Sequence, residues 1–230
     1  MKMNASKTKS FIVSRSRTNY PPHPTIYIND TPIADTKSMK FLGINFDSKL
    51  SFEEHIRSIS SMAASKLGII RKAARVYSDP SINLTCFRSF VLPLLEYGSP
   101  VWAGASDCHL KLLNKVHNQA KFLFPDNGNY DLEHRRKVSS LSLLHKIYNC
   151  IDHSLNSTLP TTVRINQDTR LSVSLHNHCL ELAQTRTEQF SKSFIPKTIR
   201  LWNGLPSYVF DNPSANAFKS AVNRYLKLSD

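Results

Sequence analysis

The chain has 230 residues, which suits one large or two small domains, and 40% of them are hydrophobic, which excludes a wholly disordered protein. Lysine and arginine number 30 against 17 aspartates and glutamates, so the net charge is +13 with neutral histidine and the pI is about 9.7. Such an excess attracts polyanions and favours nucleic acid as a partner; the alternative is a basic solvated surface without a specific ligand.

The chain has four cysteines, Cys86, Cys108, Cys150 and Cys179, and no two of them have the C-x-x-C spacing. We therefore expect reduced thiols and an intracellular protein, cytoplasmic or nuclear. No run approaches the roughly 18–20 apolar residues of a membrane span, so no membrane partner is expected. The first residues, MKMNASKTKSFIV, contain no long apolar segment, so no signal peptide is expected either.

Short strands are predicted in the first part of the chain. The segments Phe11–Ser16 and Thr25–Asp30 alternate apolar and polar side chains, as half-buried strands do, and turn residues separate them. A last strand is predicted at Met39–Phe46. Gly43 lies inside it, which indicates a bulge or the close approach of another backbone.

A long helix is predicted to follow these strands. Ser51 and Glu54 have the spacing of a capping box, in which the serine hydroxyl accepts from the glutamate amide and the glutamate reaches back. Apolar residues at helical spacing continue to about Tyr77. The sequence therefore predicts one helix from this box to Tyr77.

Further helices are predicted along the rest of the chain. Asp79 and Pro80 have the residue types of an N-cap and a first helical position, and this second helix ends near Gly98 with a kink at Pro93. The remaining predicted helices are Asp107–Phe124, Leu132–His153, Ile195–Asn203 and Ser214–Leu228. Residues 155–195 are rich in Thr, Ser and Asn and are expected to be irregular, with a short strand at Arg170–Leu175.

These elements predict an α+β fold that is mainly α. A small N-terminal antiparallel β-hairpin platform should cover residues 1–48, a helical bundle 49–155, and an irregular segment with a terminal helix 156–230.

Four stretches resemble a known family: Asn4–Lys9 (NASKTK), Lys40–Asp47 (KFLGINFD), Leu95–Trp102 (LEYGSPVW) and Arg200–Pro206 (RLWNGLP). In this order and spacing they are similar to the C-terminal part of reverse transcriptases of non-LTR (LINE-type, jockey-like) retrotransposons. One such stretch is weakly specific, whereas four in order, across nearly the whole chain, are specific.

The resemblance implies roles for three parts of the chain. Lys7 would be the lysine that supports the nucleotide triphosphate. Phe41, Leu42 and Gly43 would lie in the primer grip, a hairpin that positions the primer end. The helices from Ser51 onward resemble the thumb, which packs on the template–primer duplex.

The family's polymerase chemistry requires two metal ions held by carboxylates. In the family these carboxylates come from an aspartate-bearing strand and a [YF]-x-D-D hairpin upstream of the lysine motif. The present sequence contains no Asp-Asp pair, and Asp30, Asp35 and Asp47 lack the spacing to hold two metals. We therefore expect a truncated reverse-transcriptase fragment that is inactive alone and has no cofactor, although the full-length family uses magnesium.

Two alternatives stay open. The chain could belong to a complete RNA-directed DNA polymerase whose upstream palm is missing from this gene model. It could instead be a helical protein-interaction module with no nucleic-acid role.

The expected partner is the backbone of a DNA or RNA–DNA duplex, with no small-molecule substrate and with the oligomeric state undetermined. The candidate contact residues are Phe41, Leu42, Gly43, Lys66, Arg71, Lys72, Arg75, Lys121, Arg135, Arg136 and Lys137. For the basic residues the alternative is a solvated helix face. For Phe41 and Leu42 it is the hydrophobic core of the hairpin.

Three other patterns are interpreted as structural. Tyr97 and Trp102 are expected to form a packed aromatic corner after a helix. The stretch His176–Cys179 lacks the two spaced ligand pairs of a structural zinc site, so no metal is expected. Ser106–His109 brings Ser, Asp and His close only in sequence, which does not make a catalytic triad.

Overall fold

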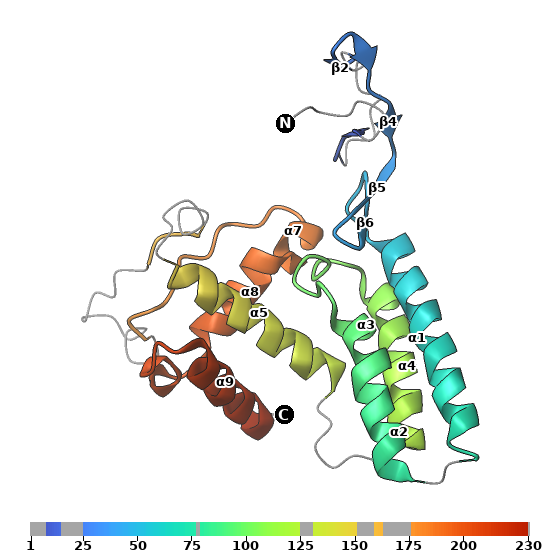
Figure 1. The fold of residues 1–230 in the computed structure, drawn as a ribbon. Coiled ribbons are helices and arrows are strands. Elements are labelled where there is room, and N and C mark those ends of the chain that lie inside the picture. Colours follow the sequence, from blue (N-terminus) through green and yellow to red (C-terminus); the bar gives the residue numbers. More distant parts are fainter. Residues whose placement is uncertain are drawn as a thin grey trace.

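The computed structural model describes residues 8–14, 25–76, 79–124, 131–150, 159–162 and 176–229, and the statements below concern these residues (Figure 1). Short strands project from one end of a helical lobe formed by α1 to α4. A second helical lobe, formed mainly by α5, α8 and α9, lies beside the first. The predicted α+β, mainly α fold is confirmed.

The strands are shorter than predicted. β1 (Ser10–Phe11) pairs in parallel with β4 (Asp35–Thr36), and β2 (Tyr27–Ile28) pairs antiparallel with β3 (Thr31–Pro32). Asn29 and Asp30, which end the predicted strand and are turn-forming residue types, have φ values of 47° and 59° and form the turn between β2 and β3. Two consecutive left-handed residues are the geometry of a two-residue hairpin turn, which asparagine and aspartate tolerate.

The predicted strand Met39–Phe46 is in fact a hairpin. β5 (Ser38–Phe41) pairs antiparallel with β6 (Ile44–Asp47). Leu42 and Gly43 form the turn, with φ values of 45° and 84°. The interpretation of Gly43 as a bulge was therefore wrong, because a two-residue turn of this hand requires positive φ at both positions and glycine meets it without strain.

The first helix, α1 (Glu53–Ala73), begins without the predicted capping box and ends before Tyr77. Phe52 is the N-cap, in a left-handed conformation with φ of 56°. The Asp47 carboxylate caps the turn instead, accepting from the amides of Lys49, Ser51 and Phe52 at 3.0, 3.0 and 2.7 Å. Partial burial alone would raise the pKa of Asp47, but these hydrogen bonds outweigh it and lower the pKa.

The predicted second helix is divided into three parts. α2 (Pro80–Cys86) begins as expected, with the Asp79 side chain accepting from the amide of Ser81. A π-helix, η2 (Phe87–Val91), follows, and α3 (Leu92–Glu96) completes the run. Because Pro93 has no N–H, the preceding carbonyls lose a helical partner, and the widened turn accommodates that loss.

The other predicted helices agree with the structure to within a few residues, but the helix Glu188–Lys192 lies in the segment that was expected to be irregular, and the 3-10 helix Ser207–Phe210 was not predicted. α5 ends at Tyr148, before the predicted end at His153, and Asn149 and Cys150 are not helical. The predicted short strand at Arg170–Leu175 lies outside the described residues. The elements are α4 (Asp107–Leu123), α5 (Leu132–Tyr148), α7 (Glu188–Lys192), α8 (Phe194–Asn203), the 3-10 helix η4 (Ser207–Phe210) and α9 (Ala215–Ser229).

Each lobe has its own hydrophobic core, and α5 contributes to both. Leu132, at the start of α5, packs with the first core, which includes Phe87 and Trp102. Leu141 and Leu144 pack with the second core around Trp202. The sequence placed all of α5 within the 49–155 bundle, whereas most of the helix packs on α8 and α9.

Candidate nucleic-acid interface

The turn of the β5–β6 hairpin is exposed and is held against the end of α3. Phe41 and Leu42 are 57% and 75% exposed, so the interpretation of both as hairpin core was wrong. The Tyr97 hydroxyl donates to the backbone carbonyl of Leu42 at 2.7 Å. A Cβ at Gly43 would lie 3.4 Å from Cε1 of the Tyr97 ring, which is an ordinary van der Waals contact, so the positive φ and not the space favours glycine here.

The residues after α3 hold Tyr97 in place. Gly98 has φ of 64°, and a Cβ there would lie 2.5 Å from Cδ1 of Ile44 in the hairpin. The Trp102 indole donates to the Tyr97 carbonyl at 3.0 Å. Trp102 is fully buried, as predicted for an aromatic corner. Tyr97 is 55% exposed, since it lies at the surface against the exposed hairpin turn. Two of the four stretches that resemble the family therefore contact each other.

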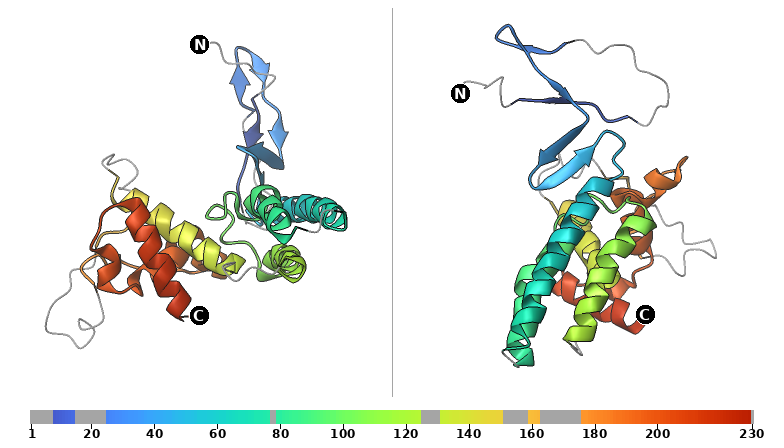
Figure 2. Two further views of the ribbon diagram at one scale, coloured as in Figure 1. Left: turned by 60° about the horizontal axis from the view of Figure 1, so that its bottom comes forward. Right: turned by 90° about the vertical axis from the view of Figure 1, so that its right-hand side faces the viewer.

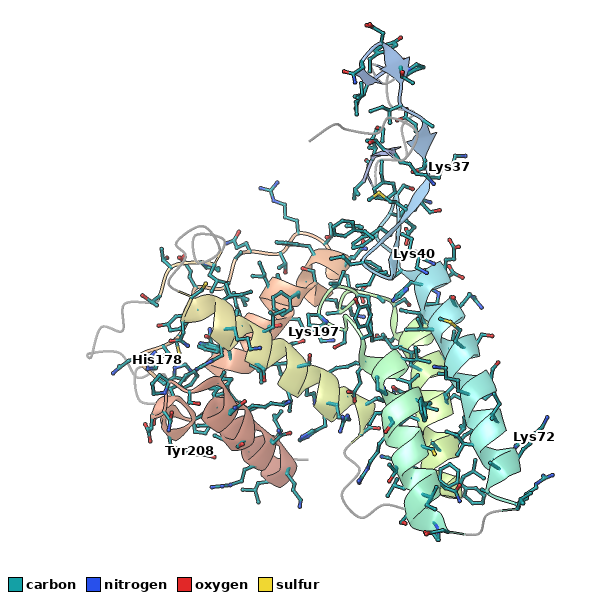
Figure 3. All side chains as sticks on the ribbon, in the orientation of Figure 1. Lys37, Lys40, Lys72, His178, Lys197 and Tyr208 are labelled. Carbon is teal, nitrogen blue, oxygen red and sulfur yellow. The ribbon has the colours of Figure 1, made fainter. Side chains whose placement is uncertain are left out.

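The predicted basic residues of α1, and Arg75 in the turn after it, are all exposed. They are Lys66, Arg71, Lys72 and Arg75. Lys72 points away from the protein at the far end of α1, whereas Lys37 and Lys40 lie along the strands (Figure 3). Arg71 differs from the other three because it lines a groove between α1 and α4.

The groove between α1 and α4 has a volume of about 960 Å³. Glu53 faces His109 at 3.7 Å, and the Ser60 hydroxyl donates to the Leu112 carbonyl at 3.3 Å, so the two helices run in the same direction. They lie side by side in the right-hand view of Figure 2. The polar lining is three cations and three amides, with no carboxylate: Arg71, Lys111, Lys115, Asn114, Asn118 and Gln119.

Lys111 and Lys115 were not among the predicted contact residues. They lie one helical turn apart on the exposed side of α4. Their spacing places them on one face of a helix, but only the packing of α4 beside α1 brings them near Arg71. A second hollow, lined by Arg57, Ser60 and Ser61, shares Lys115 with the groove and extends it toward the hairpin.

Four other predicted contact residues make interactions within the protein. Lys121 pairs with Asp131 at 3.7 Å, and Lys137 with Glu133 at 3.3 Å. Arg135 forms a two-pronged ion pair with Glu96 that joins α5 to α3. Arg136 donates to Asn114 Oδ1 at 3.0 Å, and its guanidinium lies 5.5 Å from the Trp102 ring centre.

The family-like stretch Arg200–Pro206 organises the second lobe. The buried Trp202 indole donates to the carbonyl of His178 at 2.7 Å. The Asn203 side chain accepts from the Leu180 amide and donates to the Leu180 carbonyl, at 2.9 and 2.8 Å. His176 bonds the Trp202 carbonyl through Nε2 at 3.0 Å, so the histidines of 176–179 have structural partners.

Lys7 lies outside the described residues. Within the residues that are described, no group of three or more His, Cys, Asp or Glu side chains is placed to hold a metal ion. No described helix is long and apolar enough to cross a membrane.

Two curated proteins of Drosophila melanogaster are similar to this chain. A probable RNA-directed DNA polymerase from transposon X-element is 26% identical over 119 residues, covering 51% of this chain and 13% of the relative. The RNA-directed DNA polymerase from mobile element jockey is 28% identical over 168 residues, covering 65% of this chain and 18% of the relative. The chain thus spans less than a fifth of either relative's length.

No family model and no solved structure matches the chain. The two relatives agree with the resemblance carried by the four stretches. The chain is a reverse-transcriptase-related protein, homologous to part of the RNA-directed DNA polymerases of non-LTR retrotransposons.

Proposed function

We propose that these 230 residues bind the sugar–phosphate backbone of a DNA or RNA–DNA duplex through the α1/α4 groove, without sequence preference. The supporting observation is the composition of the groove: Arg71, Lys111 and Lys115 line it together with three amides and no carboxylate. Cations neutralise phosphates and release counterions, and amides donate to phosphate oxygens. Neither kind of contact reads base sequence.

The hairpin turn would contact the same ligand. It is joined to the first turn of α1 by Asp47, and the hollow at Arg57 extends the groove toward it. Phe41 and Leu42 present apolar surface that no described part of the chain covers fully. Such side chains pack against sugars and bases in nucleic-acid complexes. Lys66 and Lys72 on α1, and Arg75 just after it, would add long-range attraction.

We further propose that these residues do not polymerise nucleotides by themselves. Two-metal phosphoryl transfer needs carboxylates that converge on the ions. The 230 residues contain no adjacent aspartates, so the required carboxylates, the magnesium ions and a role for Lys7 would depend on polypeptide outside this sequence. Incorporation of labelled deoxynucleotides into a primed template by the purified chain would refute this proposal.

Binding is tested by measuring duplex affinity against salt concentration. A wild-type plot of log K against log salt should be linear with a clearly negative slope. The double variant Arg71→Gln, Lys115→Gln should bind more weakly, and its slope should be smaller in magnitude by about 2. The double variant Lys219→Gln, Lys227→Gln, which changes two exposed lysines on α9, is the control for net charge. Equal slopes for the double variant and the wild type would contradict the proposal.

A further inference from the structure

A second, smaller cavity of about 260 Å³ lies between the two lobes. Its walls come from the loop after α3, from α4, from the start of α5 and from α8. Lys197 on α8, labelled in Figure 3, lines it near the junction of the lobes. The cavity is therefore built from segments far apart in the sequence.

Arg136 is the central cation of this cavity. Its guanidinium lies over the Trp102 ring and donates to Asn114, but its buried Nε has no hydrogen-bond partner among the described residues. Among the described residues no direct ion pair joins it to a carboxylate, and Asp131, Glu133 and Glu96 attract it from a greater distance. Burial lowers the pKa of the Arg136 guanidinium, which reflects the cost of holding this charge away from water.

The cavity carries more positive than negative charge. Its two carboxylates are already paired with lysines: Asp107 with Lys192 at 2.9 Å and Glu133 with Lys137 at 3.3 Å. Lys111, Arg136 and Lys197 also line the cavity, and Glu133 and Asp107 attract Lys197 without forming a direct ion pair with it in the described residues. The lining therefore carries four cations and two carboxylates, so an anion that entered would meet a net positive charge.

A buried hydroxyl completes the arrangement. Ser99 is only 3% exposed, and its Oγ has no hydrogen-bond partner within the described part of the chain. It lines the same cavity as Arg136. Leaving a buried hydroxyl without a partner costs about 1–3 kcal/mol, so such groups usually face a ligand or a solvent molecule.

We propose that this cavity is a phosphate-binding site, in which Arg136 and Lys197 neutralise the phosphate group and Ser99 donates to it. A planar guanidinium matches the oxygens of a phosphate, and a hydroxyl adds one more donor. The volume exceeds that of a single phosphate and lies below the range of drug-sized ligands.

The phosphate could belong to a nucleic-acid backbone or be a free ion. Lys111 and Asn114 line both this cavity and the α1/α4 groove, so a strand in the groove could continue across α4 and place a phosphate here. The backbone source rests on the proposed function, whereas the free ion does not.

The first experiment titrates inorganic phosphate into the full chain at constant ionic strength, with chloride as reference, and follows the thermal midpoint. Wild type should show a saturable rise. Ser99→Ala and Lys197→Gln should each weaken phosphate affinity about 3- to 10-fold, and Lys227→Gln should not. A purely structural Ser99 would leave phosphate affinity unchanged in Ser99→Ala. That result, or no saturable response in wild type, overturns the proposal.

The second experiment measures duplex affinity of Lys197→Gln and Ser99→Ala. A loss in both beyond that of Lys227→Gln assigns the site to a backbone phosphate, and no loss, together with weakened phosphate binding, assigns it to a free ion. Either result supports a phosphate site. The double variant Arg71→Gln, Lys115→Gln tests the groove, and phosphate titration tests the cavity. If one proposal is refuted, the other can still be tested.

Discussion

The Tyr97 hydroxyl lies 2.7 Å from the carbonyl oxygen of Leu42, across 55 positions of sequence. This hydrogen bond attaches the exposed hairpin turn to the end of α3. It thereby holds in one orientation the two apolar side chains, Phe41 and Leu42, that we propose as contacts of a duplex. The first family-like stretch in the described residues thus depends on the second for its position.

Tyr97→Phe should destabilise the protein by about 0.5–1.5 kcal/mol, because it removes one hydrogen bond and leaves the ring in place. Denaturation by urea measures the change. Tyr208→Phe is the matched control, since Tyr208 is similarly exposed and its hydroxyl makes no hydrogen bond to a described residue. Equal stability of Tyr97→Phe and wild type would show that the contact with Leu42 contributes nothing.

Gly98→Ala should destabilise by about 2 kcal/mol or more. A positive φ costs a residue with a side chain about 1–2 kcal/mol. The new Cβ would also lie only 2.5 Å from Cδ1 of Ile44, so the Ile44 side chain would have to move. The counterpart is Gly68→Ala within α1, where a Cβ meets nothing within 4 Å. That change should stabilise by up to about 1 kcal/mol because alanine favours helix. Thermal denaturation should therefore move in opposite directions for the two variants.

Arg135→Gln should lower stability by about 1–2 kcal/mol while weakening duplex binding less than Arg71→Gln does. The reason is that Arg135 is held by Glu96 between the two lobes, whereas Arg71 faces the groove. Unfolding in urea and duplex titration, run on both variants, separate the two effects. A larger binding loss for Arg135→Gln would identify it as a contact residue.

Stability should fall as the pH drops from about 6.5 to about 4. Burial, and then the charge of Lys121, lower the pKa of His117 to about 4, and the Asp131 carboxylate 3.9 Å away only partly offsets this. Because the folded pKa lies below the unfolded value, the unfolded chain takes up the proton first, and about 3 kcal/mol is lost across this window. Burial acts in the same direction on His145 and His176.

Urea denaturation at pH 7.5 and pH 4.5 tests this directly. His117→Leu should retain its stability at pH 7.5, since neither ring nitrogen of His117 has a hydrogen-bond partner among the described residues. It should lose less stability than wild type at pH 4.5. An unchanged pH dependence in this variant would exclude His117 as the source.

The long helices, the N-cap at Asp79 and the buried apolar faces followed from residue types and spacing within single segments. The same local patterns predicted the wrong cap for α1. The Asp47 carboxylate caps the helix start by accepting from the Phe52 amide, and it reaches this amide only after the hairpin has folded back. These patterns also failed to predict the hairpin turn, because a continuous run of strand-forming residues does not indicate that both Leu42 and Gly43 have positive φ.

The sequence by itself determined the helical fold class, the basic charge and the relationship to retrotransposon polymerases, because each depends on composition, on periodicity within one element or on short stretches in order. Only the tertiary structure decided which cations line the α1/α4 groove. Arg71 joins Lys111 and Lys115 because α4 packs beside α1, while Arg135 is neutralised by a glutamate 39 positions away. Contacts between distant segments set the surroundings of each charge, and no pattern within one helix records them.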